Sequence, residues 1–402
     1  MTADVAVVGL GLIGAGALRH LAADGVDVVG VGPPEPDPGT WATHLGPFAS
    51  HYDSGRITRL LDARFEWAEL AARAIAEYPA IERDGGFAFH TPASTVFASA
   101  DADHIARLDA VGRRVGARHE VLGSAATGLP TTDDGRVLVA DGRLALPTGS
   151  TVVAEPGPAG FVDPRRMLAA QLAAAARHGA RVVRAAAVDV ARRDGAWRVT
   201  TADGQVVEAQ RVLVATGAHT GELAPLVGRF PSRVRPETVV IATLAEPEAQ
   251  RLAGIPSVLS HLTGTSFADL YQVPPTRYPD ATIGLKLGAT LREWEPLADG
   301  TARRAWMAGR DHERWLPELR SLVEDLVPGV RAEAWTTKPC MITDTPSGLP
   351  TVDHVDDGLV VAAGGNGYAA KSADAIGALA ATLLREGRWS DPVLDPAPFA
   401  LP

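Results

Sequence analysis

The only cysteine of the 402-residue chain is Cys340, in the stretch TTKPCMITDTP. A single cysteine has no internal partner for a disulfide, so its thiol can serve as buried filler, metal ligand, nucleophile or attachment point. Lys338 lies two residues earlier, and a nearby cation favours the reactive thiolate by lowering the thiol pKa. Taken alone, a free cysteine is most often a buried structural residue.

A second reactive side chain, Lys286, stands between two glycines in the segment IGLKLG. In a strand, the two-residue period puts the aliphatic residues on one face and Lys286 on the other, beside Gly284 and Gly288. Glycine neighbours leave room for a flat group to come close. A fixed ammonium there would stabilise negative charge developing in a reaction; the alternative is a solvent-facing lysine.

Two arginines, Arg56 and Arg59, are three residues apart in SHYDSGRITR. If this stretch is helical, their guanidinium groups share one face. A surface salt bridge is the usual role of such residues, so the arginines gain a further meaning only from their context.

The segment GLGLIG places Gly9, Gly11 and Gly14 in G-x-G-x-x-G register. An apolar run at residues 4–8 predicts a strand before it, and an alanine-rich helix and a second strand, residues 26–31, follow. In a βαβ unit the first glycine permits the turn, the second admits a pyrophosphate, and the third allows close packing. The helix N-terminus offers unpaired N–H groups to the phosphates, so the pattern predicts a dinucleotide site.

The acid that usually binds the ribose is missing, because the end of the second strand falls at Gly32. Glu35 or Asp37 in the following loop would have to reach round, or backbone and water hold the ribose. The glycine turn does not distinguish NAD from FAD. A second glycine turn and helix, AAGGNGYAAKSADAIG, comes more than 300 residues later. A flavin would use such a helix start for its negative edge, and an ordinary βα unit is the alternative.

The elements that must position these residues alternate along the chain. Strand–helix patterns occur at the N-terminus, around VDPRRMLAAQLAAAARHGARVV and at the C-terminus, with β-rich stretches between them. Residues 57–78 are predicted to be helical. We predict an α/β fold in which a Rossmann-like FAD-binding domain is interleaved with an α+β substrate domain built on a β-sheet. The FAD-binding domain takes residues 1–85, 152–227 and 336–402, and the substrate domain takes 86–151 and 228–335.

Composition excludes several classes of protein. Hydrophobic residues make up 46% and charged residues 21% of the chain, and the net charge is −10, so neither nucleic acid nor an anionic membrane is expected as a partner. No apolar run approaches the roughly 20 residues of a membrane span. A single cysteine fits a reducing compartment, and no basic n-region precedes the first apolar run. We expect a cytoplasmic protein. The eleven histidines show no metal-binding spacing.

Five segments, in order and at similar spacing, resemble the monomeric sarcosine oxidase family of FAD-dependent amine oxidases, within the D-amino-acid-oxidase-like superfamily. They are GLGLIG, SHYDSGRITR, GLKLG, CMITDTP and GGNGYAAK. The family includes N-methyltryptophan, pipecolate and fructosyl-amino-acid oxidases. The resemblance spans nearly the whole chain, and its last four segments are more specific than the first.

The resemblance implies a role for each segment. FAD would be attached covalently through its 8α-methyl group to Cys340, which begins the family's C-x-x-T-x-T-P-like stretch. Lys286 would lie over the flavin and assist the reaction with O2, with Arg56 near the ring as the other catalytic residue. The implied substrate-binding residues are Arg59, Lys371, Tyr271 and Tyr368, the first two clasping the substrate carboxylate. The implied cofactor-binding residues are Gly9, Gly11, Gly14, Ser50, His51, Arg56, Val188, Cys340, Gly365, Gly367 and Lys371.

Two positions depart from the family. Thr290 and Tyr368 stand where sarcosine oxidases carry histidines that line the substrate pocket. The resemblance therefore predicts oxidation of a secondary amine, an N-substituted or cyclic amino acid, whose substituent differs from methyl. It implies a monomer that uses O2 and releases H2O2. The alternatives are a flavin-dependent amine dehydrogenase with another acceptor, an NAD-dependent dehydrogenase, and a dinucleotide-binding protein without turnover.

Overall fold

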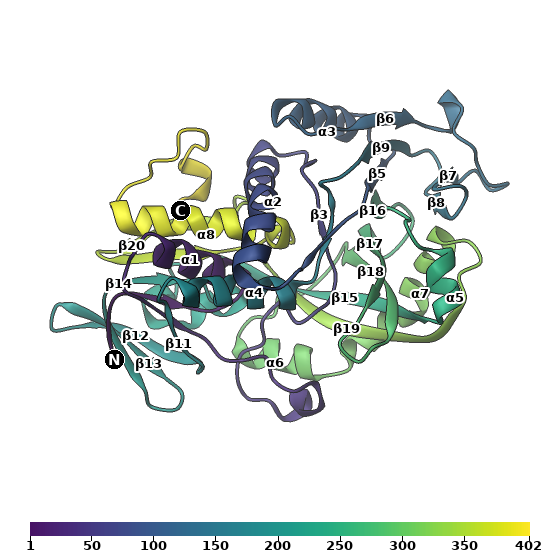
Figure 1. The fold of residues 1–402 in the computed structure, drawn as a ribbon. Helices are drawn as coiled ribbons and strands as arrows, with labels where there is room; N and C mark the ends of the chain where they lie inside the picture. The colour runs from purple at the N-terminus through teal and green to yellow at the C-terminus, as the bar shows by residue number, and fades with distance from the viewer.

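Two eight-stranded β-sheets organise the protein, and each draws its strands from distant parts of the chain (Figure 1). The computed structural model describes residues 1–402. The first sheet has the order β11-β2-β1-β14-β13-β12, and β21 pairs with β14 and β20 with β21. Its strands are β1 (Thr2–Val8), β2 (Val28–Val31), β11 (Arg181–Val183), β12 (Ala187–Arg193), β13 (Ala196–Thr201), β14 (Val206–Val214), β20 (Thr351–Asp356) and β21 (Leu359–Ala363).

The first sheet has a parallel centre with antiparallel additions. Strands β11, β2, β1, β14 and β21 form a parallel series in that order, while β12, β13 and β20 join antiparallel through hairpins. The predicted βαβ start is confirmed, because α1 (Leu12–Ala23) connects β1 to β2. The Rossmann-like α/β class predicted from the sequence is therefore confirmed.

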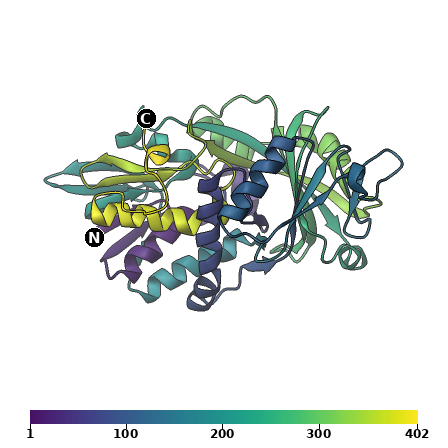
Figure 2. The ribbon, with the colours of Figure 1, turned by 90° about the horizontal axis from the view of Figure 1, so that it is seen from above.

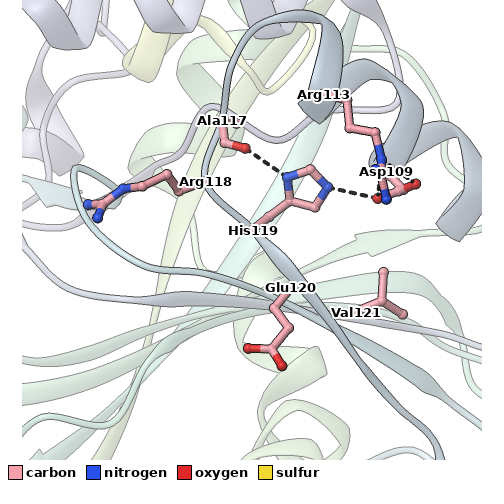
Figure 3. Close-up of a pocket in the computed structure, with 7 residues that line it drawn as sticks. All are labelled: Asp109, Arg113, Ala117, Arg118, His119, Glu120 and Val121. Atoms are coloured by element: carbon pink, nitrogen blue, oxygen red, sulfur yellow. Dashed lines mark hydrogen bonds and ion pairs between the residues drawn. The ribbon is translucent and has the colours of Figure 1, made fainter.

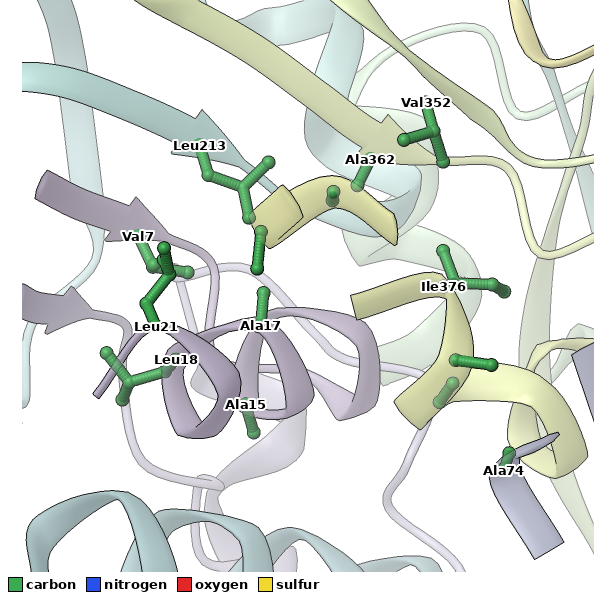
Figure 4. Packing of buried hydrophobic residues seen from close by; sticks show 14 of the residues in the cluster. Val7, Ala15, Ala17, Leu18, Leu21, Ala74, Leu213, Val352, Ala362 and Ile376 are labelled. Carbon is green, nitrogen blue, oxygen red and sulfur yellow. The ribbon is translucent and has the colours of Figure 1, made fainter. Parts of the chain in front are cut away.

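Four helices pack against the first sheet, and together with it they form the largest hydrophobic core of the protein. They are α1, α2 (Phe65–Gly85), α4 (Pro164–Arg177) and α8 (Ala369–Glu386), and Figure 2 shows α8 and α1 side by side along the sheet. In Figure 4, Val7 and Leu213 from the strands face Leu18 and Leu21 of α1 and Ile376 of α8. Each of these side chains is at most 1% exposed, and such burial contributes roughly 1.5–3 kcal/mol per large apolar side chain.

The glycine turn between β1 and α1 is sterically defined. Gly9 has a φ of +97°, and a Cβ at this position would lie 2.5 Å from the carbonyl oxygen of Ala215. A Cβ on Gly14 would lie 1.8 Å from the carbonyl oxygen of Gly9, so helix and turn touch there. A Cβ on Gly11 would meet nothing within 4 Å. Two glycines therefore serve the fold, and the third leaves open space at the helix N-terminus.

The second sheet has the order β19-β15-β18-β17-β16-β5-β9-β6. Its aliphatic face, with Leu285 and Leu287, belongs to a separate core that includes residues of α7. Strand alternation turns Lys286 to the opposite face. The strands are β5 (Thr95–Ser99), β6 (Glu120–Gly123), β9 (Thr151–Glu155), β15 (Arg233–Leu244), β16 (Ser257–His261), β17 (Phe267–Arg277), β18 (Ile283–Leu291) and β19 (Ala332–Asp344).

Two smaller sheets and four further helices complete the fold. Strands β3 (Arg56–Thr58), β10 (Gly160–Val162) and β4 (His90–Pro92) form one sheet, and β7 (Val137–Val139) with β8 (Leu144–Leu146) forms a hairpin. The remaining helices are α3 (Ala102–Arg114), α5 (Glu246–Arg251), α6 (Gly300–Ala308) and α7 (Leu316–Leu326). None of the helices has both the length and the apolar character needed to cross a bilayer.

The helix predicted for residues 57–78 is wrong in its first part. Residues 56–58 form β3, and the helix α2 begins only at Phe65. The reason lies about 95 positions further along the chain, where the buried carboxylate of Glu155 accepts hydrogen bonds from the backbone N–H groups of Leu60, at 2.8 Å, and Leu61, at 3.0 Å. These two N–H groups are bonded to Glu155 and make no helical hydrogen bonds, so residues 59–64 form an irregular, bent connection to α2.

The division into two interleaved domains remains a proposal, and strand pairing bears on its boundaries. Strand β9, placed mostly within the flavin part, pairs with β5 and β6 in the second sheet. Strand β19 pairs with β15 over its whole length, although residues 336–344 were also placed in the flavin part. Both strands pair only within the second sheet, so each belongs to the substrate side by its hydrogen bonds.

A test of the glycine turn compares two substitutions. Gly14→Ala would place a methyl group against the backbone of Gly9, and overpacking of this kind costs about 1–3 kcal/mol or more. Gly11→Ala meets open space and is the matched control. We expect a clear fall in the melting temperature for Gly14→Ala alone, measured by circular dichroism. Equal melting temperatures for the two variants would contradict the described packing.

Candidate active site

Three segments meet where the two sheets approach each other. They are the loop of residues 50–62, the polar face of the second sheet, and the first turn of α8. Two short contacts define the meeting: Lys286 Nζ lies 2.6 Å from Asp53 Oδ2, and Lys371 Nζ lies 2.9 Å from Asp62 Oδ2. The loop thus supplies one carboxylate to each of the two buried lysines.

The first contact is part of a buried ionic cluster. Asp53 pairs with both Lys286 and Arg56, and Lys286 also donates a hydrogen bond to the carbonyl oxygen of Gly55. Burial opposes ionisation of Asp53, but Lys286 and Arg56 outweigh it and hold its pKa well below the usual range. Burial lowers the pKa of Lys286 to about 8, against the opposing effect of Asp53. The ammonium of Lys286 is therefore close to losing its proton at mildly alkaline pH.

The space beside Lys286 was expected to admit a flat group, and side chains of the protein fill it. Lys286 does face away from the aliphatic core, as its alternation predicts, but protein rings occupy the places beside Gly284 and Gly288. A Cβ on Gly284 would lie 2.6 Å from the ring of Tyr278, and one on Gly288 would lie 2.4 Å from the ring of Tyr271. The ammonium lies 5.3 Å from the centroid of the Tyr271 ring, so the flat neighbours that need the two glycines are tyrosines.

Cys340 lies on β19 at the edge of the same cluster. Its Sγ atom is 3.6 Å from Nη2 of Arg56. Burial raises the pKa of the thiol, and the charge of Arg56 opposes this without reversing it. Lys338, expected to activate the thiol, instead has its ammonium 5.1 Å from the centroid of the Tyr278 ring. The cation in contact with the sulfur is thus Arg56, which comes from 284 positions away in the chain.

The second contact joins Arg59 and Lys371 through Asp62. Nη2 of Arg59 lies 3.4 Å from Oδ2 of Asp62, the oxygen that also contacts Lys371. Arg59 Nε is buried without a hydrogen-bond partner. Burial and the nearby Arg59 lower the pKa of Lys371 to about 8, although Asp62 favours its charge. The two predicted carboxylate-binding cations are therefore brought together, and a carboxylate of the chain itself lies between them.

The arginine pair does not share a helical face. Arg56 is the first residue of β3, and Arg59 follows the strand, so the expectation of a common helix is wrong. The two guanidinium groups serve different partners, since Arg56 contacts Asp53 and Cys340 while Arg59 contacts Asp62.

Tyr368 stands next to the Arg59–Lys371 pair as the N-cap residue of α8. Its ring stacks on Trp67 with centroids 5.3 Å apart, and the guanidinium of Arg59 lies 5.5 Å from its centroid. Burial raises the pKa of the phenol to about 12, yet 38% of the residue is exposed. We expect Tyr368 to form a partly open wall of the site.

The glycine turn before α8 is held against the cysteine segment. The backbone N–H of Thr345 donates to Oδ1 of Asn366 at 2.8 Å, and the N–H of Asn366 donates to the carbonyl oxygen of Thr343 at 3.0 Å. Gly365 and Gly367 flank Asn366 in this turn, and Gly367 has a positive φ of 82°. The CMITDTP and GGNGYAAK segments are thus neighbours in space.

The missing ribose acid has a steric explanation. A Cβ on Gly32 would lie 2.8 Å from the backbone nitrogen of Leu10 and 2.9 Å from its Cβ, so Leu10 fills the place of an acidic side chain. Glu35 does not reach round, because its carboxylate forms two 2.7 Å hydrogen bonds with Arg165. Asp37 accepts a hydrogen bond from the backbone N–H of Gly39 instead.

The remaining predicted cofactor residues lie in different surroundings. The carbonyl oxygen of Ser50 accepts a hydrogen bond of 3.0 Å from Arg56. His51 is buried, and burial together with nearby arginines lowers its pKa to about 3, so its imidazole is neutral. Val188 sits at a β-bulge near the start of β12 with its side chain 59% exposed. A role of these three residues in cofactor binding remains a prediction.

Sequence reasoning missed the acids of the site. Asp53, Asp62 and Glu155 hold the loop, and Glu237 on β15 pairs with Cys340 in the strand register. Their positions follow from contacts between residues far apart in the chain. Asp53 and Asp62 could have been noted because each lies three residues from one of the two singled-out arginines.

A surface hollow of about 530 Å³ lies away from these residues (Figure 3). It is lined by residues of α3, of β6 and of the segment between them, and His119 is its only imidazole. Nδ1 of His119 is 2.8 Å from the carbonyl oxygen of Ala117, and Nε2 is 3.0 Å from Asp109. Both ring nitrogens therefore have partners, and none of the predicted site residues lines the hollow.

Comparison with protein families decides the class of the protein. The family described as DAO, FAD dependent oxidoreductase, matches residues 4–383. The chain belongs to this family. The protein is therefore an FAD-dependent oxidoreductase, and FAD rather than NAD is its dinucleotide. No curated protein matches the sequence.

Solved structures share the DAO fold with this protein at low sequence identity. The amino acid oxidase NikD, essential for nikkomycin biosynthesis, has a TM-score of 0.75 at 19% identity, covering 100% of this chain and 97% of that chain. Glycine oxidase from Geobacillus kaustophilus has a TM-score of 0.71 at 20% identity, covering 100% and 98%. L-proline dehydrogenase from P. horikoshii has a TM-score of 0.71 at 16% identity, covering 99% and 97%. These similarities establish the fold.

The residues present fit a flavin dinucleotide. The space at Gly11 beside the N-terminus of α1 admits a pyrophosphate close to the backbone. At the other end of the site, the sulfur of Cys340 and the cations Arg56 and Lys286 lie within one cluster. The DAO protein thus has an open glycine turn on one sheet and a thiol with cations beside it on the other.

Proposed function

We propose that this DAO-family protein is a sarcosine-oxidase-like amine oxidase that oxidises a secondary amine, an N-substituted or cyclic amino acid. The observation that carries the proposal is that the segment of residues 50–62 takes part in two separate cationic sites. Arg59 lies with Lys371 in one, and Arg56 lies with Lys286 beside Cys340 in the other. The first pair suits a substrate carboxylate. The second suits a flavin that must react with O2.

The chemistry divides between the cofactor and the chain. FAD, when bound, supplies the acceptor, flavin N5, for the hydride from the carbon next to nitrogen, and returns the electrons to O2. Substrate amine and O2 give imine and H2O2, because the amine loses one hydride and one proton. A linear imine is then hydrolysed by water, and a cyclic imine is released.

Arg59 and Lys371 would orient the substrate through its carboxylate. Asp62 already accepts from both cations, so an entering carboxylate has to share them with it. Positive charge around the amine favours its neutral form, which holds the nitrogen lone pair needed for oxidation. We infer that the chain prepares the amine by electrostatics, since no free side-chain base is required for that step.

Lys286 would act in the second half of the reaction. Its ammonium is 1% exposed, so it works at low dielectric, where a fixed positive charge strongly stabilises negative charge developing on O2. Asp53 and the carbonyl oxygen of Gly55 hold it in place. Tyr271 completes the wall beside it.

A dehydrogenase with another electron acceptor is the second candidate, and the fold similarity to an L-proline dehydrogenase favours keeping it. The two functions share the first half-reaction and differ in the speed of the second.

The first test separates the half-reactions. Oxidised enzyme is mixed without O2 with sarcosine, N-methyl amino acids, pipecolate, proline and primary amino acids, and flavin absorbance is followed. We expect at least one secondary amine to bleach the flavin, and H2O2 to appear when O2 is admitted. Bleaching followed by slow reoxidation would identify the dehydrogenase. Absence of bleaching by every amine, in flavin-loaded protein, would contradict amine oxidation.

Covalent attachment of the flavin is tested by acid precipitation of the holoenzyme. We expect the yellow colour to stay with the polypeptide and the flavin mass to be found on the peptide that contains Cys340. Cys340→Ala should release its flavin into the supernatant, because the chain has no other thiol. Flavin released from the unaltered protein would remove the proposed role of Cys340 and leave the fold unaffected.

The role of Lys286 predicts a pH dependence. With a pKa of about 8, the ammonium is present below that pH and is lost above it, so the rate of reoxidation by O2 should fall as pH rises through about 8. Lys286→Met should slow reoxidation by about 10²–10³-fold and remove the fall in rate near pH 8. Lys338→Met is the matched control and should keep both the rate and its pH dependence. The rate of reoxidation is measured by mixing reduced enzyme with O2 in a stopped-flow instrument over a range of pH. An unchanged pH–rate profile in Lys286→Met would refute the role of Lys286.

A further inference from the structure

The face of the second sheet that carries Cys340 and Lys286 also carries two acids that the mechanism does not use. Glu237 on β15 pairs in register with Cys340, and Asp269 on β17 pairs with Thr290. Because Thr238 pairs with Ala289, the antiparallel register brings Glu237 alongside Thr290. The two acids therefore lie on the same face of the sheet, one on either side of β18.

The acidic groups on this face outnumber the cations that form ion pairs with them. Arg235 is the only ion-pair partner of Glu237, at 2.9 Å, and it shares its guanidinium with Asp344, at 3.0 Å. Asp269 has no ion-pair partner within 4 Å, although His261, Arg235 and Arg292 act on it from a distance. Burial raises the pKa of Glu237 to about 8, and Asp269 adds to the effect. Burial likewise raises the pKa of Asp269.

Glu237 also has an unused acceptor. The residue is 2% exposed, its Oε2 atom accepts from Arg235, and its Oε1 atom is buried without any partner. Buried oxygens of this kind are uncommon, because leaving one unpaired costs about 1–3 kcal/mol. A donor brought by a ligand would remove this cost.

Tyrosines lie near both the acids and the carboxylate-binding pair. On β17, Tyr271 is two residues from Asp269 and shares its face, because Asp269 pairs with Thr290 and Tyr271 with Gly288. The guanidinium of Arg59 lies 5.5 Å from the centroid of the Tyr368 ring, and the charges of Asp62, Arg59, Asp269 and Arg235 all act on the pKa of Tyr368. The acids are therefore within electrostatic reach of the residue that borders the Arg59–Lys371 pair.

We propose that Glu237 and Asp269 form the second end of the substrate site and select an amino acid that carries an additional positively charged group. This inference rests on the proposed function and specifies its substrate class. A protonated amino or guanidino group would donate to Oε1 of Glu237, and its charge would favour the ionised form of this carboxyl and pair with Asp269. An apolar substituent would leave Oε1 of Glu237 without a donor and Asp269 without an ion-pair partner, which is costly.

The test uses probes that bind without being oxidised as secondary amines. The holoenzyme is titrated with 4-aminobutanoate, 6-aminohexanoate and 8-aminooctanoate, and with butanoate, hexanoate and octanoate, at neutral pH. Each probe offers a carboxylate to Arg59 and Lys371, and only the amino acids offer an ammonium to the acidic end. Binding is measured from the change in flavin absorbance. For at least one length, we expect the amino probe to bind at least about tenfold more tightly than its neutral partner.

Variants locate the discrimination. The ratio of the two dissociation constants should approach one in Asp269→Asn and in Glu237→Gln, while Asp133→Asn, an exposed acid elsewhere, should keep it. Asp269 is only half-buried, so its variant keeps the test available if Glu237→Gln does not fold. Equal or tighter binding of the neutral probes at every length, or a ratio unchanged in Asp269→Asn, would overturn the proposal.

The readout distinguishes this inference from the proposed function. Charge discrimination with no oxidation of any amine would sink amine oxidation and keep the acidic end. Oxidation of secondary amines without charge discrimination would keep the proposed function and reject the acidic end. In turnover, N-methyl-lysine should exceed its neutral analogue N-methyl-norleucine in kcat/KM, and Asp269→Asn should reduce that preference.

Discussion

The buried carboxylate of Asp53 is the interaction on which the site depends. A charge that is 4% exposed is tolerated only when it is paired, because removing an isolated ion from water is very costly. Asp53 meets this need with Arg56 from its own loop and Lys286 from the second sheet. The same pairing brings the loop to the sheet, sets Arg56 beside the Cys340 sulfur, and fixes the ammonium of Lys286. Asp62 joins the loop to α8 through Lys371 in the same way.

Local pattern predicted the parts of the molecule in which near neighbours decide the structure. The glycine turn at Gly9–Gly14, the helix α4, and the direction of Lys286 on β18 all follow from spacing and residue type. These features need no knowledge of the distant chain. The resemblance assigned CMITDTP and GGNGYAAK to the same cofactor, and the Thr345–Asn366 hydrogen bond shows that the two segments are in contact.

Long-range contacts decided the rest. The helix expected from Ile57 does not form before Phe65, because Glu155 takes the N–H groups of Leu60 and Leu61. The glycines beside Lys286 were correctly interpreted as making room, but the rings that need the room are Tyr271 and Tyr278. The acids at the site are likewise placed by sheet pairing, as Glu237 is beside Cys340, and sequence spacing does not reveal that register.

The path of β19 has a consequence for how the protein is made. This strand forms an edge of the second sheet, and β20 and β21 add to the first sheet only after it. Both sheets therefore remain incomplete until nearly the whole chain has left the ribosome. The first strand, β1, also waits for β14, with Val8 paired to Val214. Folding of one domain after another during synthesis is thus closed to this chain. Its apolar sheet faces stay exposed until late in translation, when chaperones would have to shield them.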